Sequence, residues 1–193
     1  MKKSEEKKNI LLQIAQNIFA RFGLFKTTVD EIAKAARMGK SSIYYYFRSK
    51  EDIFKAVLEK ELRILKEKIA KAIAESRSPQ EKLKNFIVTR MKYVKELANI
   101  YSALKDEYLR HYEFIQKLRQ NYDIEEINII KKILQEGINQ KVFFIKDLEL
   151  TSFAIATAIK GLEYDWAIRI EEKDLEEGID KLLEVLFYGL IKR

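Results

Sequence analysis

Residues 27–54, TTVDEIAKAARMGKSSIYYYFRSKEDIF, decide how this chain of 193 residues folds. The spacing predicts two short helices, a tight turn between them and the start of a long third helix. Thr28 and Glu31 stand in the S/T-x-x-E pattern of a capping box, which opens the first of these helices. Gly39 falls in the turn. The stretch therefore predicts a helix-turn-helix, in which a capped helix is followed by a turn with a small residue and then a second helix.

The second helix of this pattern carries polar groups at its leading end. Lys40 can donate to guanine O6 or N7 in the DNA major groove. The hydroxyls of Tyr44 and Tyr46 can donate to phosphates. Ile43 and Phe47 are expected to point the other way, into the core. The alternative for the tyrosines is core packing, which is disfavoured because Ile43 and Phe47 already occupy the inward positions.

The positive charge of the chain is concentrated at one end. Residues 1–50 hold eleven basic and four acidic side chains, a net charge of +7, whereas residues 51–193 hold equal numbers of each. A local excess of Lys and Arg favours phosphate binding through counterion release. The alternative is a disordered basic tail, but most of the excess is interleaved with apolar residues at helical spacing.

The remainder of the chain reads as helix. It has one proline and six glycines. Apolar residues at helical spacing predict a first helix that begins near Ile10 and stops at Gly23. Ser49 and Asp52 predict the N-cap of a fourth helix that ends near Glu75. Further helices are predicted over 80–97, with Ser78-Pro79 at its start, and over 101–118, 124–140, 147–170 and 174–191, with Asp147 and Asp174 as N-caps of the last two. Residues 139–145 are predicted to form a loop or an extended piece.

The predicted fold is all-α and has two domains. A three-helix helix-turn-helix domain over residues 1–50 is expected to precede a helical ligand-binding and dimerisation domain over 51–193. The fourth helix, at about 50–75, is expected to link them.

Several function classes are excluded by composition. The chain has no cysteine and one histidine, so disulfides and thiolate metal sites are excluded and a His-based metal site or catalytic triad is disfavoured. It contains no G-x-S-x-G motif and no phosphate-binding loop. No apolar run reaches the roughly 18 residues that a membrane span needs, and no signal peptide is apparent. The sequence therefore predicts a cytoplasmic protein that is not an enzyme and that has no metal and no cofactor.

About residues 10–54 resemble the DNA-binding domain of the TetR family of transcriptional regulators. The family pattern has glycine and a β-branched residue where this chain has Arg37 and Met38, and the turn glycine stands at position 39 instead. The resemblance rests on these residues: Ala15, Phe19, Gly23, Thr27, Thr28, Ile32, Ala33, Ala36, Lys40, Ile43, Tyr44, Tyr45, Tyr46, Phe47, Ser49, Lys50, Glu51, Asp52 and Ile53.

The resemblance implies a set of DNA contacts. Thr28 would anchor a phosphate at the start of the motif, and Lys50 would bind one at the start of the fourth helix. Residues in between would face bases or the phosphate backbone. The predicted DNA-binding residues are Thr28, Arg37, Lys40, Ser41, Ser42, Tyr44, Tyr45, Tyr46 and Lys50.

The last two predicted helices carry apolar residues that a single chain need not bury. One helix is almost wholly apolar from Phe153 to Leu162, and the next has a broad apolar stripe. Two such helices together favour a four-helix interface with a second copy, although an intramolecular core is the alternative. The predicted interface residues are Phe153, Leu162, Leu182, Leu183, Leu186 and Phe187.

Aromatic residues are dense in the middle of the C-terminal region. Aromatic side chains with polar tips line apolar pockets that need a few orienting hydrogen bonds, although each one could instead be a core residue. The predicted pocket residues are Tyr93, Tyr101, Tyr108, Tyr112, Tyr122 and Trp166.

These patterns together predict a homodimeric repressor. A small hydrophobic or aromatic effector, including an acyl chain, would release it from a palindromic double-stranded operator. The alternative is an architectural DNA-binding protein without a ligand.

Overall fold

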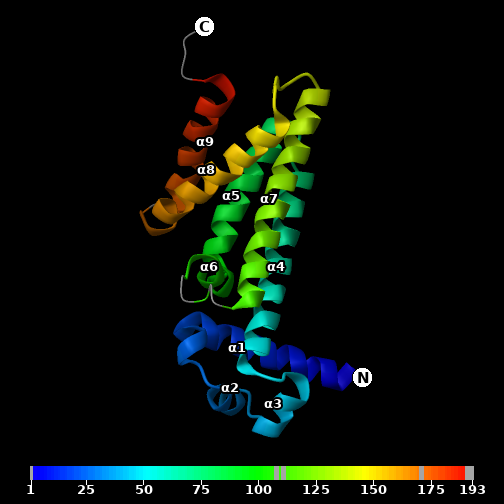
Figure 1. Cartoon of the computed structure of the whole chain (residues 1–193), viewed down its shortest axis with the longest axis vertical. Coiled ribbons are helices and arrows are strands. Elements are labelled where there is room, and N and C mark those ends of the chain that lie inside the picture. The colour runs from blue at the N-terminus through cyan, green and yellow to red at the C-terminus, as the bar shows by residue number, and fades with distance from the viewer. Residues whose placement is uncertain (1, 107–108, 110–111, 170–171, 190–193) are drawn as a thin grey trace. The chain divides into compact units, whose positions relative to one another are not determined.

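A computed structural model describes residues 2–106, 109, 112–169 and 172–189 of the chain (Figure 1). The described residues are mainly helical and contain no strand, so the predicted all-α class is confirmed. None of the described helices is long and apolar enough to cross a membrane.

Two compact units make up the described chain. The first unit contains residues up to Ile64 together with Leu97–Ile115, and the second contains Leu65–Glu96 and the residues from Gln116 onward. Helices α4 (Lys50–Ala74) and α7 (Glu113–Asn139) contribute to both units. The first compact unit is therefore larger than the predicted domain over residues 1–50, because it also includes the beginning of α4 and a segment that follows the next helix.

Besides the start of α4, four helices of the described chain shape the first unit. The backbone of α1 leaves the helical region at Gly23, whose φ is 75°, close to the predicted stop. The core contains Leu11, Ile32 and Ile43, which are fully buried, and the ring of Phe19 packs edge-on against Phe54. Besides α4, the helices are α1 (Lys2–Lys26), α2 (Val29–Ala35), α3 (Lys40–Tyr46) and α6 (Ala98–Lys105).

The turn between α2 and α3 departs from the expected one. Arg37 has a φ of 52°, whereas Gly39 has a φ of −68° and serves as the N-cap of α3. The Arg37 N–H donates to Lys34 O and the Met38 N–H donates to Ala33 O, which together form a Schellman motif at the end of α2. The left-handed position of the turn is therefore held by an arginine, while Gly39, which the sequence places in the turn, is the N-cap of α3.

The second unit is built from the later helices. Helix α5 packs against both α8 and α9. The Asp147 carboxylate accepts from the Leu150 N–H at the start of α8, so the predicted cap at Asp147 is confirmed. The Ser78 hydroxyl accepts from the Glu81 N–H at the start of α5, where the sequence predicts a helix to begin. Besides parts of α4 and α7, the helices are α5 (Pro79–Glu96), α8 (Leu148–Arg169) and α9 (Glu172–Tyr188).

The predicted helix boundaries are wrong in two regions of the chain. A single helix over 101–118 does not form, because Asp106 is extended after α6 and α7 begins only at Glu113, well before its predicted start at Ile124. Asp174 is not an N-cap, since α9 already begins at Glu172. An acidic residue in the first turn still stabilises the helix dipole, which explains why the pattern resembles a cap.

Candidate functional site

Helix α3 separates its side chains into two faces. Ile43 is fully buried and Phe47 is 7% exposed, as the periodicity predicts. Tyr44 is 48% exposed and Tyr45 is 79% exposed, while Ser42 also lies at the surface. Core packing therefore does not explain Tyr44 or Tyr45, and the helix presents hydroxyls and aromatic rings to solvent.

The beginning of α1 packs against the end of α3. The hydroxyl of Tyr46 lies 3.2 Å from Ser4 Oγ, and its ring meets Tyr45 edge-on at 5.0 Å. The ammonium of Lys8 lies 5.4 Å from the centre of the Phe47 ring. Ser4 was not singled out by the sequence, because no local pattern indicates that the two helix ends meet.

The predicted capping box of α2 is present. The Thr28 hydroxyl accepts from the Glu31 N–H, and the Glu31 carboxylate accepts from the Thr28 N–H at 2.8 Å and from its hydroxyl at 2.9 Å. These bonds from Thr28, with a smaller effect of the Lys50 charge, hold the pKa of Glu31 below its usual value. The capping contribution of Glu31 is therefore present above the usual carboxyl range and is lost as the pH falls through the lowered pKa.

Lys40 begins α3 and is held by an acid of α2. Its ammonium lies 2.9 Å from the Asp30 carboxylate, and both side chains are more than half exposed. The hydrogen bond to Asp30, followed by the charge of Asp30, raises the pKa of Lys40. Lys40 is therefore charged at neutral pH but is paired within the protein.

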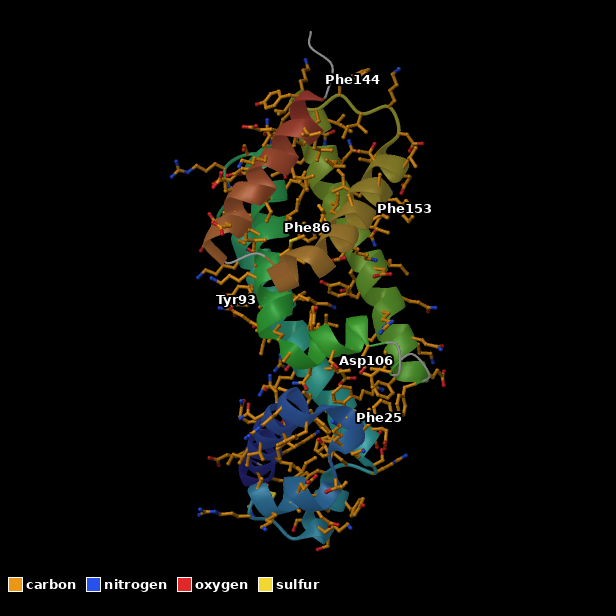
Figure 2. All side chains as sticks on the ribbon, turned by 90° about the vertical axis from the view of Figure 1, so that its left-hand side faces the viewer. Phe25, Phe86, Tyr93, Asp106, Phe144 and Phe153 are labelled. Atoms are coloured by element: carbon orange, nitrogen blue, oxygen red, sulfur yellow. The ribbon has the colours of Figure 1, made fainter. Side chains whose placement is uncertain are left out.

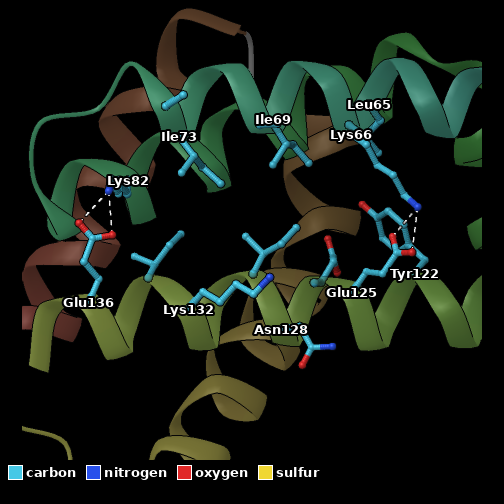
Figure 3. A pocket seen from close by; sticks show the side chains of 15 residues that line it. Leu65, Lys66, Ile69, Ile73, Lys82, Tyr122, Glu125, Asn128, Lys132 and Glu136 are labelled. Atoms are coloured by element: carbon cyan, nitrogen blue, oxygen red, sulfur yellow. Dashed lines mark hydrogen bonds and ion pairs between the residues drawn. The ribbon is translucent and has the colours of Figure 1, made fainter. Parts of the chain in front are cut away.

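The second unit contains a cavity of about 700 Å³ between α4 and α7 (Figure 3). Leu65, Ile69 and Ile73 of α4 line it at helical spacing, and Ile129 and Ile133 of α7 line it opposite. The other lining residues are Lys66, Ala70, Ala74, Lys82, Tyr122, Glu125, Glu126, Asn128, Lys132 and Glu136. The cavity is mainly apolar with charged groups among its walls.

Most of these charges are paired. Lys66 binds Glu125 and Lys82 binds Glu136, each at 2.7 Å (Figure 3). Glu126 accepts from the buried Arg90 of α5. Lys132 forms no ion pair with the described residues. Lys132 is therefore a lysine of these walls whose ammonium no carboxylate of the described residues holds.

Comparison with known proteins identifies the family. Residues 11–57 match the family model described as "Bacterial regulatory proteins, tetR family", which covers the helix-turn-helix and the start of α4. The chain belongs to the TetR family of transcriptional regulators. As a TetR-family member it is a DNA-binding transcriptional regulator, and its relatives are regulators and not enzymes, as predicted.

Three TetR-family relatives illustrate the similarity. The chain is 26% identical to the uncharacterized HTH-type transcriptional regulator YhgD of Bacillus subtilis, over 94% of this chain and 95% of that protein. It is 28% identical to the fatty acid metabolism regulator protein of the same organism, over 98% of each chain. A crystal structure of FadR from Bacillus subtilis in complex with stearoyl-CoA is 26% identical, with a TM-score of 0.70 over 94% of this chain and 98% of that one.

The structure does not bring the predicted aromatic residues together. Tyr122 lines the cavity, but Tyr93 lies under the Lys68 ammonium at 5.2 Å. Tyr101 and Tyr112 belong to the other compact unit. The remaining two predictions, Tyr108 and the side chain of Trp166, lie outside the described residues. The isoleucines that do line the cavity stand four residues apart on each helix, and this spacing was the available signal.

The predicted interface residues differ in how far their side chains are exposed. Phe153 is 56% exposed and Leu186 is 43% exposed, whereas Leu183 is 4% exposed (Figure 2 labels Phe153). Leu183 is therefore a core residue of its own unit and is not available for the dimer interface to which the sequence assigned it. Phe187 stacks on Phe143 at 5.7 Å. Of the other two predictions, Leu162 and Leu182 are half-buried.

We expect Asp30→Asn to strengthen DNA binding. The substitution frees Lys40 and removes a negative charge that lies next to the start of α3. An exposed ion pair is weak, so the gain should be modest, up to about fivefold for each helix-turn-helix domain. The measurement is the dissociation constant for a selected operator duplex. Glu51→Gln is the control, since it removes the same charge without contacting Lys40. Equal gains in both variants would show that the pairing is irrelevant.

We expect Lys50→Ala to weaken DNA binding by the same factor on every sequence. The Lys50 ammonium lies 3.5 Å from Phe25 O at the start of α4, and a phosphate would be a stronger partner for it. The slope of log K against log salt should fall by about one for each phosphate contact that is lost. A loss confined to some sequences, with the salt slope unchanged, would contradict this role.

Proposed function

We propose that this TetR-family regulator is a homodimeric repressor that an amphiphilic effector releases from a palindromic operator. The observation that carries the proposal is the cavity between α4 and α7. Its volume of about 700 Å³ suits a small molecule, because ligand pockets typically span about 300–1,000 Å³. Repressor function fits the relatives of this chain, and dimers are typical of the family, so both support the proposal.

The walls of the cavity favour a ligand with two chemical parts. Five Leu and Ile side chains, from both helices, suit an alkyl or acyl chain. The ammonium of Lys132, which forms no ion pair with a described residue, suits an anionic group on the same molecule. The relatives support this class, since one is named a fatty acid metabolism regulator and another binds stearoyl-CoA. We therefore infer a long acyl chain joined to an anionic group.

A single helix, α4, connects the helix-turn-helix to the cavity. Helix α4 begins at Lys50, directly after the helix-turn-helix, and the same helix lines the cavity from Leu65 to Ala74. An effector that binds one position of α4 better than another shifts the population toward that position. The two helix-turn-helix domains of a dimer must lie about 34–36 Å apart to bind successive major grooves. A shift of α4 that alters this spacing would therefore lower operator affinity.

The direct test of the effector class is a binding series. Acyl-CoA molecules of increasing chain length are titrated into the protein in thermal-shift and calorimetric experiments, with free CoA and fatty alcohols as controls. We expect the melting temperature and the affinity to rise with chain length, and the alcohols to bind more weakly than the anionic ligands. An unchanged melting temperature with every ligand would favour the alternative of an architectural DNA-binding protein.

A further inference from the structure

Glu61 is a buried carboxylate in the middle of α4. It is 1% exposed, and its hydrogen-bond partners among the described residues are all uncharged donors. It accepts from Gln16 Nε2 at 2.8 Å, from Asn99 Nδ2 at 2.7 Å and from the backbone N–H of Ile100 at 2.8 Å. Burying a charge is costly unless hydrogen bonds compensate it, so these bonds are needed for Glu61 to remain in place.

One of these bonds replaces a missing helix cap. The N-cap of α6 is Leu97, whose side chain can form no hydrogen bond, and Ile100 is the third residue of that helix. An N-cap Ser or Asp normally accepts from the N–H at this position. Here the acceptor is supplied by Glu61 from another helix. Its negative charge also matches the positive end of the α6 dipole.

Another of these bonds connects the same carboxylate to α1. Gln16 of α1 donates to Glu61, and Asn99 of α6 donates to Gln16 O at 3.1 Å. Lys60 donates to Gln13 Oε1 and Gln16 Oε1, at 2.6 Å and 3.1 Å. Three helices therefore meet at Glu61. Helix α1 in turn packs against α2, the first helix of the helix-turn-helix.

We propose that Glu61 is a positioning residue for DNA binding: by capping α6 from α4 and holding Gln16, it fixes α1 and α6 in the arrangement that binds the operator. Glu61 itself contacts no DNA. The proposal rests on DNA binding alone and needs no effector, so it can fail without affecting the proposed effector class, and the reverse also holds.

The test is Glu61→Gln. Glutamine has one acceptor oxygen and adds two N–H donors, so it cannot accept all three bonds. Removing a negative charge would by itself favour DNA binding, so a loss must come from the lost bonds. At a temperature where circular dichroism shows the variant folded, we expect operator affinity to fall by about tenfold or more. The salt slope should stay unchanged, because no phosphate contact is lost. Hydrogen exchange at the Ile100 amide should be at least about tenfold faster.

Two further variants complete the test. Glu59→Gln removes the same charge from an exposed position two residues earlier on α4, and its operator affinity should not fall. Gln16→Met removes the α1 bond but leaves the α6 cap, and it should also weaken operator binding with an unchanged salt slope. Wild-type affinity in Glu61→Gln would overturn the proposal. If Glu61→Gln does not fold, wild-type affinity in Gln16→Met would overturn it.

Discussion

Ile73→Trp combined with Ile129→Trp is expected to leave operator binding intact and to abolish its response to acyl effectors. The two side chains belong to opposite walls of the cavity, α4 and α7, and both are half-buried. Larger rings at these positions would occupy the space that an acyl chain needs. Neither position belongs to the compact unit that contains the helix-turn-helix, so DNA binding should be retained.

The size of the effect follows from the apolar area that the effector no longer buries. Each excluded methylene costs about 0.8 kcal/mol, so excluding three or four should raise the releasing concentration by about two orders of magnitude. The measurement is the concentration of effector that releases half of the bound operator. Ile124→Trp is the matched control, because Ile124 is an exposed residue of α7 that does not line the cavity. An unchanged response in the double variant would show that the effector binds elsewhere.

Phe153→Glu combined with Leu186→Glu is expected to give a monomer that has lost most of its operator affinity. These are large apolar side chains of α8 and α9 that the described chain leaves exposed. Charges placed there would be buried without partners in a dimer. A monomer binds one half-site, so it loses the gain in affinity from linking two helix-turn-helix domains, which is a factor of about 10²–10⁴. Light scattering gives the mass, and fluorescence anisotropy gives the affinity.

A matched substitution separates the interface from general effects of charge. Ile124→Glu introduces the same charge at an exposed apolar residue of α7 and should leave the dimer mass unchanged. A dimer that survives the change at Phe153 and Leu186 would place the interface on another surface. Leu183→Glu is not informative, because Leu183 is buried within its own unit and the variant would unfold that unit.

The helix-turn-helix was predictable because its determinants are local. The capping box at Thr28 and the Ser49 cap involve residues three positions apart, and the inward direction of Ile43 and Phe47 follows from helical periodicity. The left-handed conformation at Arg37 was missed, because arginine gives no sign of it. The Schellman hydrogen bonds at the end of α2 fix that conformation regardless of the side chain.

The cavity and the interface were less predictable because they depend on which helix faces meet. The sequence favoured tyrosines as pocket residues, yet the cavity lies between isoleucines of α4 and α7, together with Tyr122. Periodicity identified the apolar stripe of α9 but could not separate Leu183, which faces the core, from Leu186, which does not. The Glu61 bonds join residues far apart in the chain, so no local pattern could indicate them.

The central claim is that an acyl effector bound in the cavity weakens operator binding. Its most direct test is fluorescence anisotropy of a labelled operator duplex, obtained by binding-site selection, during titration with stearoyl-CoA and, as a control, with free CoA. We predict that stearoyl-CoA dissociates the complex at concentrations that also raise the melting temperature of the protein, and that free CoA does not. A complex that remains intact while stearoyl-CoA demonstrably binds the protein would contradict the account.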